Sequence, residues 1–226
     1  MKSEPLLTFE KHLDTIIHLA KLMESGKTYA FNPVNDAMDK LKGLVSAGRQ
    51  IPEANANDAF TGAMTALEEV RHYVELLTFL RDWMLVMIVA FAEAYLENIL
   101  TLLVKRNPAW VDDLKLKVSY AELTASASLA GGMETISNRW QRSWVTNILR
   151  DKPPQWITRL EKLGAHGYRT GLPADMTSVW DKGHAIIHSG ETQSLSASEF
   201  KKALNVIGSF VEPTDRFVVA FLAGHS

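Results

Sequence analysis

The sequence predicts an all-α protein, a bundle of up-and-down helices with an N-terminal helical extension, and three observations predict it. First, apolar residues recur at spacings of three and four along almost the whole chain, and no long stretch keeps the alternation typical of a β-strand. Second, glycines, prolines and Ser-x-x-Glu patterns fall between these segments, where helices begin and end. Third, 46% of the 226 residues are apolar, which is enough for a sizeable core.

The N-terminal half predicts three helices separated by polar turns. We expect them, in chain order, over Thr8–Glu24, Val34–Ala47 and Asp58–Val104. Ser25-Gly26 ends the first helix, and the last is either one very long helix or two helices joined near Arg81-Asp82. We therefore divide the chain into a helical extension over residues 1–57 and a bundle over residues 58–226, which together form one compact domain.

The C-terminal half predicts shorter helices. Capping boxes, in which a serine is followed three residues later by a glutamate, predict helix starts at Ser119 and Ser196. The helix after Ser196 is expected to end at Val211, and a last short helix follows the segment EPTD. Between the two capping boxes, helices are expected over Met133–Arg150, over a short segment that ends at Leu163, and from Pro173 onward.

The composition excludes several classes of protein. The formal net charge is −2 and the pI about 6.4, so the whole molecule is not a general binder of nucleic acids or anionic membranes. The chain has no cysteine, which excludes disulfides and cysteine nucleophiles and fits a cytoplasmic location. The most apolar segment, Trp83–Val104, is long enough to span a bilayer. It carries Glu93 and Glu97, however, so we expect a buried helix and no membrane association.

Charge is unevenly distributed along the chain. The segment 58–100 holds seven acidic residues against two arginines, whereas the segment 139–169 holds seven basic residues against two acidic ones. Because the basic segment also contains tryptophans, it is suited to holding phosphates and stacking bases of single-stranded RNA. The candidate RNA-binding residues are Arg139, Arg142, Arg150, Arg159, Arg169 and Trp144. The alternative is that the two segments pack together, with compensated charges and tryptophans in the core.

The most distinctive stretch is WDKGHAIIHSGE, residues 180–191, at the end of the helix that begins at Pro173. A helix turns by 100° per residue, which separates this segment into two faces. The polar face carries Thr177, Asp181, His184 and His188. The opposite face, which we expect to be buried, carries Met176, Val179, Trp180, Gly183, Ile186 and Ile187.

Four interpretations of the two histidines stay open. A His-x-x-x-His pair on one helix face is the geometry of a zinc grip, with His166 or His225 as a third ligand. A histidine that titrates near neutrality, together with a cation, can also cleave a phosphodiester without a metal. The third interpretation is ligand binding without catalysis. The fourth is an exposed helix end at which His188 complements the helix dipole.

These residues also resemble a known family. HAIIHSG, residues 184–190, resembles the signature of the HEPN superfamily, and IVAFAEAYLENIL, Ile88–Leu100, resembles the long early helix of several HEPN families. The resemblance covers about Leu76–Val211 and implies a HEPN-like helical bundle that forms a homodimer through its motif helices. It implies an association with RNA or bacterial defence, and an antitoxin or another protein as a partner. The activity would be that of a metal-independent endoribonuclease without a cofactor or, alternatively, the chain would be a noncatalytic dimerisation module.

Carried over by position, the resemblance implies roles for individual residues. His188 matches the catalytic histidine, and His184 matches the polar residue that precedes it. Glu93 matches an acidic position of the early helix, and we expect Glu93 and Asp181 to orient the other side chains. RNA cleavage would then be an internal transesterification with His188 as general base or acid.

One position departs from the family pattern. Gly183 stands where the family has an arginine, and the nearest cation is Lys182. Lysine lacks the planar fork with which arginine binds a phosphate at two points. We expect Lys182 to contact the phosphate by reaching round the helix toward His188. If neither Lys182 nor a residue of the basic segment does so, the site does not cleave.

Overall fold

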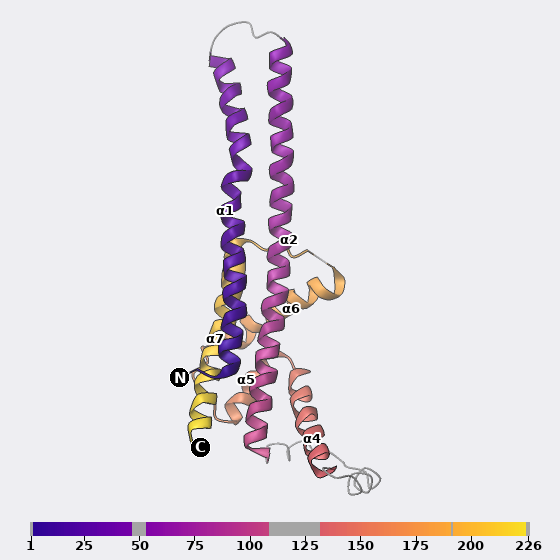
Figure 1. Cartoon of the computed structure of the whole chain (residues 1–226), viewed down its shortest axis with the longest axis vertical. Helices are drawn as coiled ribbons and strands as arrows, with labels where there is room; N and C mark the ends of the chain where they lie inside the picture. The colour runs from indigo at the N-terminus through magenta and orange to yellow at the C-terminus, as the bar shows by residue number, and fades with distance from the viewer. Residues whose placement is uncertain (1, 47–52, 109–131, 191, 225–226) are drawn as a thin grey trace.

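The computed structural model describes residues 2–46, 53–108, 132–190 and 192–224, and within these ranges it is a helical bundle without β-strands (Figure 1). The helices are α1 (Glu4–Ser46), α2 (Glu53–Arg106), α4 (Gly132–Leu149), α5 (Pro153–Lys162), α6 (Leu172–Ser189) and α7 (Ala197–Gly224). The predicted all-α class and the bundle of long helices are confirmed. The helix predicted after Ser119 lies outside the described residues.

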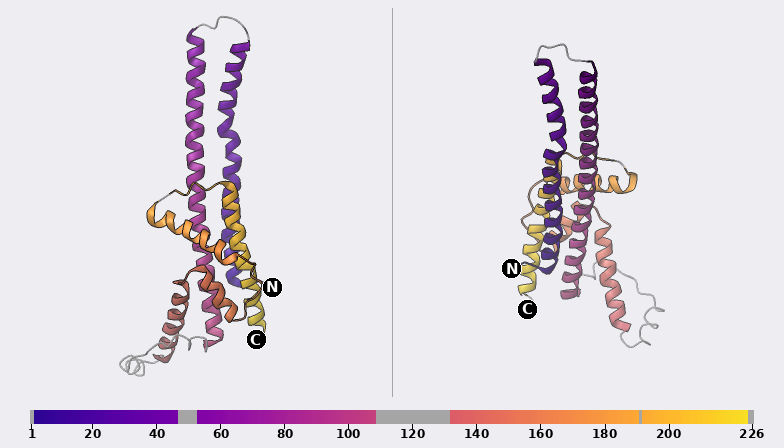
Figure 2. Two further views of the ribbon diagram at one scale, coloured as in Figure 1. Left: turned by 180° about the vertical axis from the view of Figure 1, so that it is seen from behind. Right: turned by 45° about the horizontal axis from the view of Figure 1, so that its top comes forward.

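The two longest helices set the shape of the molecule. α1 and α2 run antiparallel side by side, and their distal halves project beyond the other helices (Figure 1). α6 and α7 lie on one side of this pair, in front of it in the rear view of Figure 2. α4 and α5 lie toward the end of the pair at which both chain termini are found. The opposite side of the α1–α2 pair faces the viewer in Figure 1.

The core lies where the other helices pack on the middle and C-terminal half of α2. Ile88, Leu96, Ile99 and Leu100 of α2 have no exposed surface. Fully burying each such side chain contributes about 1.5–3 kcal/mol to stability. The N-terminal part of α1 belongs to the same core, because Phe9 is buried with its ring centroid 5.6 Å from that of Tyr95 of α2.

Two buried tryptophans join the short helices to this core. Trp156 of α5 packs edge-to-face on Trp180 of α6, with ring centroids 5.0 Å apart. The indole N–H of Trp156 donates a hydrogen bond of 2.8 Å to the backbone carbonyl of Ile148 at the end of α4. The polar atom of this buried ring is therefore satisfied, as burial requires.

α1 is a single helix, so the predicted break at Ser25-Gly26 is wrong. The Tyr73 hydroxyl of α2 donates a hydrogen bond of 2.7 Å to the carbonyl of Met23. A β-carbon added at Gly26 would collide with this hydroxyl, so the hydrogen bond as placed requires a glycine at position 26. Contacts with α2 offset the roughly 1 kcal/mol by which a glycine disfavours a helix interior.

α2 is also one helix, of 54 residues, and it continues through Arg81-Asp82. Both of these side chains hold other elements onto α2. Arg81 makes an ion pair of 2.7 Å with Glu24 of α1. The buried carboxylate of Asp82 accepts hydrogen bonds of 2.8, 3.2 and 3.2 Å from the backbone N–H groups of Gln193, Ser194 and Leu195. The loop between α6 and α7 is therefore anchored on the middle of α2.

α7 continues through the segment EPTD, so the predicted end at Val211 is wrong. Pro213 lies inside the helix, where a proline removes one backbone hydrogen bond. Contacts made by the buried residues around it compensate for that loss. The Thr214 hydroxyl lies 2.9 Å from the hydroxyl of Tyr168, which belongs to the segment between α5 and α6. A local helix-breaking signal is again overridden by tertiary packing.

Other helix ends follow the prediction. Ser196 and Glu199 form the capping box of α7, with hydrogen bonds of 3.2 Å from the Glu199 N–H to the Ser196 hydroxyl and 3.0 Å from the Ser196 N–H to the Glu199 carboxylate. Pro173 lies in the first turn of α6, and Gly190 ends that helix with a φ of 65°. Among the described helices, none combines the length and the apolar character that a bilayer span requires.

We expect the capping box of α7 to weaken in acid. Hydrogen bonds from the backbone N–H and hydroxyl of Ser196, followed by Lys182, lower the pKa of Glu199 from 4.5 to about 2. Because this pKa is lowered by folding, the stabilisation is present above pH 4.5 and is lost as the pH falls toward 2. The difference in the free energy of unfolding between wild type and Glu199→Gln should shrink over that range in urea denaturation. A difference that stays constant with pH would contradict this assignment.

Candidate functional site

α6 carries the histidine motif and presents two faces, with one departure from the prediction. Its buried residues are Leu172, Met176, Val179, Trp180 and Gly183. Of the residues predicted on the polar face, Asp181, His184 and His188 are exposed and Thr177 is half-buried. Ile187, which was expected to be buried, is 53% exposed. The reason is that α6 crosses the bundle and its C-terminal end projects beyond α2 (Figure 1), so nothing in the described chain covers its last apolar residue.

Glu93 of α2 lies beneath the histidine face of α6. Its carboxylate accepts a hydrogen bond of 2.8 Å from the indole N–H of Trp180 and lies 3.5 Å from Nε2 of His184. The rings of His184 and His188 have centroids 5.8 Å apart and are nearly perpendicular, at 85°. The structure therefore gathers Glu93, His184 and His188 into one cluster at the surface, and we call these three residues the histidine cluster.

Lys182 lies on the other side of α6. Its Nζ is 3.2 Å from a carboxylate oxygen of Glu199 on α7, at the rim of a small pocket between α2, α6 and α7. The ammonium group is thus held by an anion on the α7 side, so the expected reach toward His188 is not made. Asp181 is exposed, and no contact that would let it orient the histidines is found within the described residues.

Gly183 is a packing residue at the crossing of α6 and α2. A β-carbon added to Gly183 would lie 3.0 Å from Cγ2 and 3.5 Å from Cβ of Val89. Since carbon atoms are optimally separated by about 3.5–4.0 Å, the shorter of these contacts is repulsive. An arginine at position 183 would require Val89 to move or α6 to shift away from α2. The close contact with Val89 therefore favours a residue without a β-carbon at position 183.

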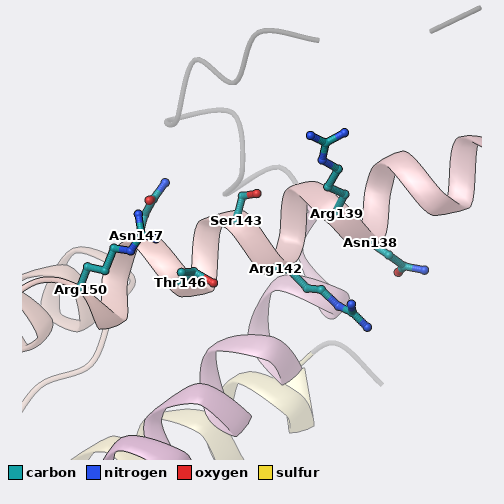
Figure 3. A pocket seen from close by; sticks show the side chains of 7 residues that line it. All are labelled: Asn138, Arg139, Arg142, Ser143, Thr146, Asn147 and Arg150. Carbon is teal, nitrogen blue, oxygen red and sulfur yellow. The ribbon is translucent and has the colours of Figure 1, made fainter. Parts of the chain in front are cut away.

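Three arginines lie on α4 or directly after its end, and Figure 3 shows the side chains of Arg139 and Arg142 pointing apart from each other. Six residues of α4 and the residue that follows it line one wall of a pocket: Asn138, Arg139, Arg142, Ser143, Thr146, Asn147 and Arg150. Arg139, Arg142 and Arg150 are all exposed. Within the described part of the chain, no ion pair is found for Arg142 or Arg150. We call Arg139, Arg142 and Arg150 the arginine face.

The other predicted RNA-binding residues are placed differently. Arg159 makes an ion pair of 2.7 Å with Asp151, and Arg169 makes one of 2.6 Å with Asp175. Trp144 is only 4% exposed and belongs to the core, so its ring cannot stack on a base in this structure. The tryptophan thus follows the alternative interpretation, in which helical tryptophans are core anchors. The two ion pairs are local, and neither involves the acidic residues of α2.

The histidines offer two ligands of a zinc grip, and the described residues add no third. No group of three or more His, Asp or Glu side chains within the described residues is placed to hold a metal ion. His166 is exposed on the segment after α5, and His225 lies outside the described residues. A two-histidine site without a third protein ligand falls short of the usual tetrahedral zinc geometry.

Sequence reasoning missed three partners in this region. They are Trp180 as the donor to Glu93, Glu199 as the counter-ion of Lys182, and Val89 as the neighbour of Gly183. The first partner has a signal in the sequence, because a carboxylate inside an apolar helix needs a donor and a buried indole needs an acceptor. The other two have none, since they depend on how three helices cross in space.

Because Gly183 meets Val89, we expect Gly183→Arg to destabilise the fold instead of restoring a catalytic arginine. Overpacking of this kind costs about 1–3 kcal/mol, which exceeds or cancels the roughly 1 kcal/mol gained by removing a glycine from a helix. The same substitution combined with Val89→Ala should recover part of the loss. Urea denaturation of the two single variants and the double variant measures this coupling.

Gly208→Ala in α7 is the matched control, because a β-carbon there meets no atom within 4 Å. This variant should be about 1 kcal/mol more stable than wild type. Gly183→Ala should gain less than Gly208→Ala or lose stability. Equal gains at the two positions would show that Gly183 is not a close-packing residue.

We compared the chain with protein families, with curated proteins and with solved structures, and none of them matches. The likeness to the HEPN superfamily therefore rests on the residues that carry it, which are the motif of α6 and the apolar run of α2. The chemistry of the site follows from its own geometry. Within the described residues, that geometry is a histidine cluster from which Lys182 is turned away, and an arginine face on a separate helix.

Proposed function

We propose that this chain is a HEPN-like RNA-associated protein that holds RNA phosphates on the arginine face and does not cleave them, as a noncatalytic member of a bacterial defence or stress system. The observation that carries the proposal is the arginine face itself. Its three arginines are exposed and line one pocket, and Arg142 and Arg150 lack an ion pair within the described residues.

The spacing of the arginine face suits an extended phosphate backbone. Arg139 and Arg150 are eleven residues apart, which corresponds to about 16 Å along a helix. Arginine binds a phosphate at two points through its planar fork, and three such groups in a row favour a polyanion over a single phosphate. The neighbouring Ser143, Thr146 and Asn147 add hydrogen-bond partners for phosphate or ribose oxygens. RNA is preferred over DNA on the family resemblance alone.

The environment of the histidine cluster disfavours cleavage of RNA. Acid–base cleavage of RNA needs a cation to stabilise charge on the phosphate oxygens. Lys182 is held by Glu199 on the opposite side of α6. Position 183 has no side chain that could supply a cation, because a β-carbon there would meet Val89. The charged side chain that the structure places beside His184 is Glu93, whose negative charge repels a phosphate.

The second candidate is a metal-independent endoribonuclease, and one observation favours it. His184 contacts Glu93, and the ring of His188 lies next to that of His184 at the surface. A carboxylate that orients one of two neighbouring histidines is an arrangement used in acid–base catalysis. In this case the cation would have to be supplied by a partner protein or by a rearrangement of this chain when RNA binds.

We expect binding of single-stranded RNA to depend on the arginine face and on salt. Each phosphate contact contributes a slope of about −0.7 to a plot of log K against log salt concentration, so losing two contacts should flatten the slope by about 1.4. The double variant Arg142→Ala/Arg150→Ala should therefore bind a labelled single-stranded RNA more weakly than wild type. Fluorescence anisotropy between about 50 and 200 mM salt measures both effects.

Lys11→Ala combined with Lys21→Ala is the matched control for this experiment. Both residues are exposed cations of α1, so the control removes the same net charge on a different helix. It should leave the affinity and the slope close to those of wild type. An equal loss in both double variants would mean that net charge, not the arginine face, governs binding. Binding that neither pair affects would refute the proposed site.

We expect purified protein to leave RNA uncleaved in EDTA. Wild type and His188→Ala, incubated with structured and single-stranded RNA, should give the same pattern on a denaturing gel. Cleavage by wild type that His188→Ala abolishes would support the endoribonuclease instead. Cleavage that appears only when zinc is added would support a metal site at the two histidines. RNA binding by anisotropy in the same samples separates a lack of cleavage from a lack of binding.

A further inference from the structure

A cavity of about 130 Å³ lies where α6 and α7 pack on α2. It is lined by these three helices and by the loop that precedes α7. The helix α6 contributes one of its sides, which carries Asp175, Ser178 and Lys182 at spacings of three and four. His184 is turned by about 200° from Lys182, so the cavity and the histidine cluster lie on opposite sides of α6.

The inner part of the cavity is apolar. Five buried apolar residues line it: Leu85 of α2, Val179 of α6, Leu195 of the loop, and Ala203 and Val206 of α7. An apolar cavity of about 150 Å³ holds one benzene molecule, so the space here suits an apolar group of about five or six carbon atoms. Hydrocarbon that enters this space leaves water, which favours binding.

The opening of the cavity is charged. Nζ of Lys182 lies 3.2 Å from a carboxylate oxygen of Glu199, and Nζ of Lys202 lies 3.9 Å from one of Asp175. Both ion pairs join α6 to α7 at the cavity. The lysine side chains are 38% and 71% exposed. Exposed ion pairs contribute little to stability, so these two can be exchanged for contacts with a ligand at low cost.

The two carboxylates have further partners, whereas the two lysines do not. Asp175 accepts a hydrogen bond of 2.6 Å from Arg169, and Glu199 accepts one of 3.0 Å from the backbone N–H of Ser196. Both carboxylates also lie in the first turn of a helix, where the helix dipole favours negative charge. No second ion pair is found for either lysine in the described part of the chain. A bound anion therefore competes for the lysines without leaving a carboxylate unpaired.

We propose that this cavity binds a small monocarboxylate with a hydrocarbon tail of about five or six carbon atoms. The tail lies against Leu85 and Val206, and the carboxylate lies at the opening, where Lys182 and Lys202 supply positive charge. Small-molecule sites commonly combine an apolar interior with a few polar groups that fix the orientation of the ligand. The site is separate from the arginine face, so it does not depend on RNA binding.

Charge and size disfavour other ligands. An amine would have to compete with Arg169 and Ser196 for carboxylates that are already bound. A neutral alcohol fills the apolar part but gains no charge-assisted hydrogen bond at the opening. A protein or a nucleic acid could place no more than one side chain or one base in a space of this volume.

Hexanoate is the probe, and NMR of the full chain with labelled leucine and valine methyl groups locates it. Four labelled residues line the cavity: Leu85, Val179, Leu195 and Val206. Their methyl signals should shift in a saturable way as hexanoate is added, whereas those of Val145 in α4 should not. Shifts that are largest in α4 would mean that the carboxylate binds the arginine face, which overturns the proposal. Cavity methyl signals that do not respond overturn it too.

Three related probes separate the contributions of tail and charge. Hexan-1-ol keeps the tail without the charge, hexylamine reverses the charge, and acetate lacks the tail. Loss of the hydrogen bonds to a charged group should raise the dissociation constant of hexan-1-ol about tenfold relative to hexanoate. Hexylamine should bind more weakly still, and acetate should not shift the cavity methyl signals. Equal affinity for hexanoate and hexylamine would refute the role of the lysines, and equal affinity for acetate would refute the apolar site.

Lys182→Met combined with Lys202→Met tests the opening, because methionine keeps an apolar stem without the charge. This double variant should bind hexanoate about tenfold more weakly and should bind hexan-1-ol as wild type does. Lys201→Met is the control, since Lys201 is an exposed lysine of α7 that does not line the cavity. A wild-type affinity for hexanoate in the double variant refutes the proposal. So does a loss in Lys201→Met as large as that in the double variant.

Ala203→Leu tests the interior of the cavity. The larger side chain occupies the space from α7, so hexanoate should no longer shift the methyl signals of Leu85. Circular dichroism checks that the helices are intact. Unchanged binding of hexanoate by this variant would refute the proposed site. The lysine variants test the same site at positions that are not buried, so the result does not depend on how well the core accepts leucine.

Discussion

The packing of other helices around α2 is the constraint on which the rest of the structure depends. α1, α4, α6 and α7 all contact this one helix, and residues such as Ile88, Leu96 and Leu100 lose all of their exposed surface in doing so. Burial on this scale supplies most of the favourable free energy of a helical fold, since isolated helices are marginal in water. The loop before α7 is tied to the same helix through the buried carboxylate of Asp82.

One crossing within this arrangement determines the candidate site. Gly183 lets α6 approach Val89 of α2 closely. This contact fixes where α6 crosses α2 and which face of α6 is turned toward it. The rotation brings His184 onto Glu93 and turns Lys182 toward Glu199 on α7. The residue that lets the two helices approach closely is thus the residue that sets the geometry of its neighbours.

The two ion-paired arginines of the basic segment find their partners nearby in the chain and not across the bundle. Arg159 and Arg169 are paired with Asp151 and Asp175, which lie eight and six residues away in the chain. The arginines of α4 face outward, on the side of that helix opposite its buried residues Val145 and Ile148. The polyanion that we propose as their ligand would therefore bind on a surface separate from the core of the bundle.

The sequence by itself determined the all-α class, the capping box of α7, the termination of α6 at Gly190 and the polar face on which both histidines lie. These features depend on periodicity and on local hydrogen bonds, which neighbouring residues specify. Tertiary structure alone decided that α1, α2 and α7 run through their glycine, charged or proline signals. It also decided where Lys182 points and that Trp144 is buried while Ile187 is exposed. The physical reason is one of magnitude: a helix-breaking residue costs about 1–3 kcal/mol, and contacts with helices distant in the sequence can exceed that cost.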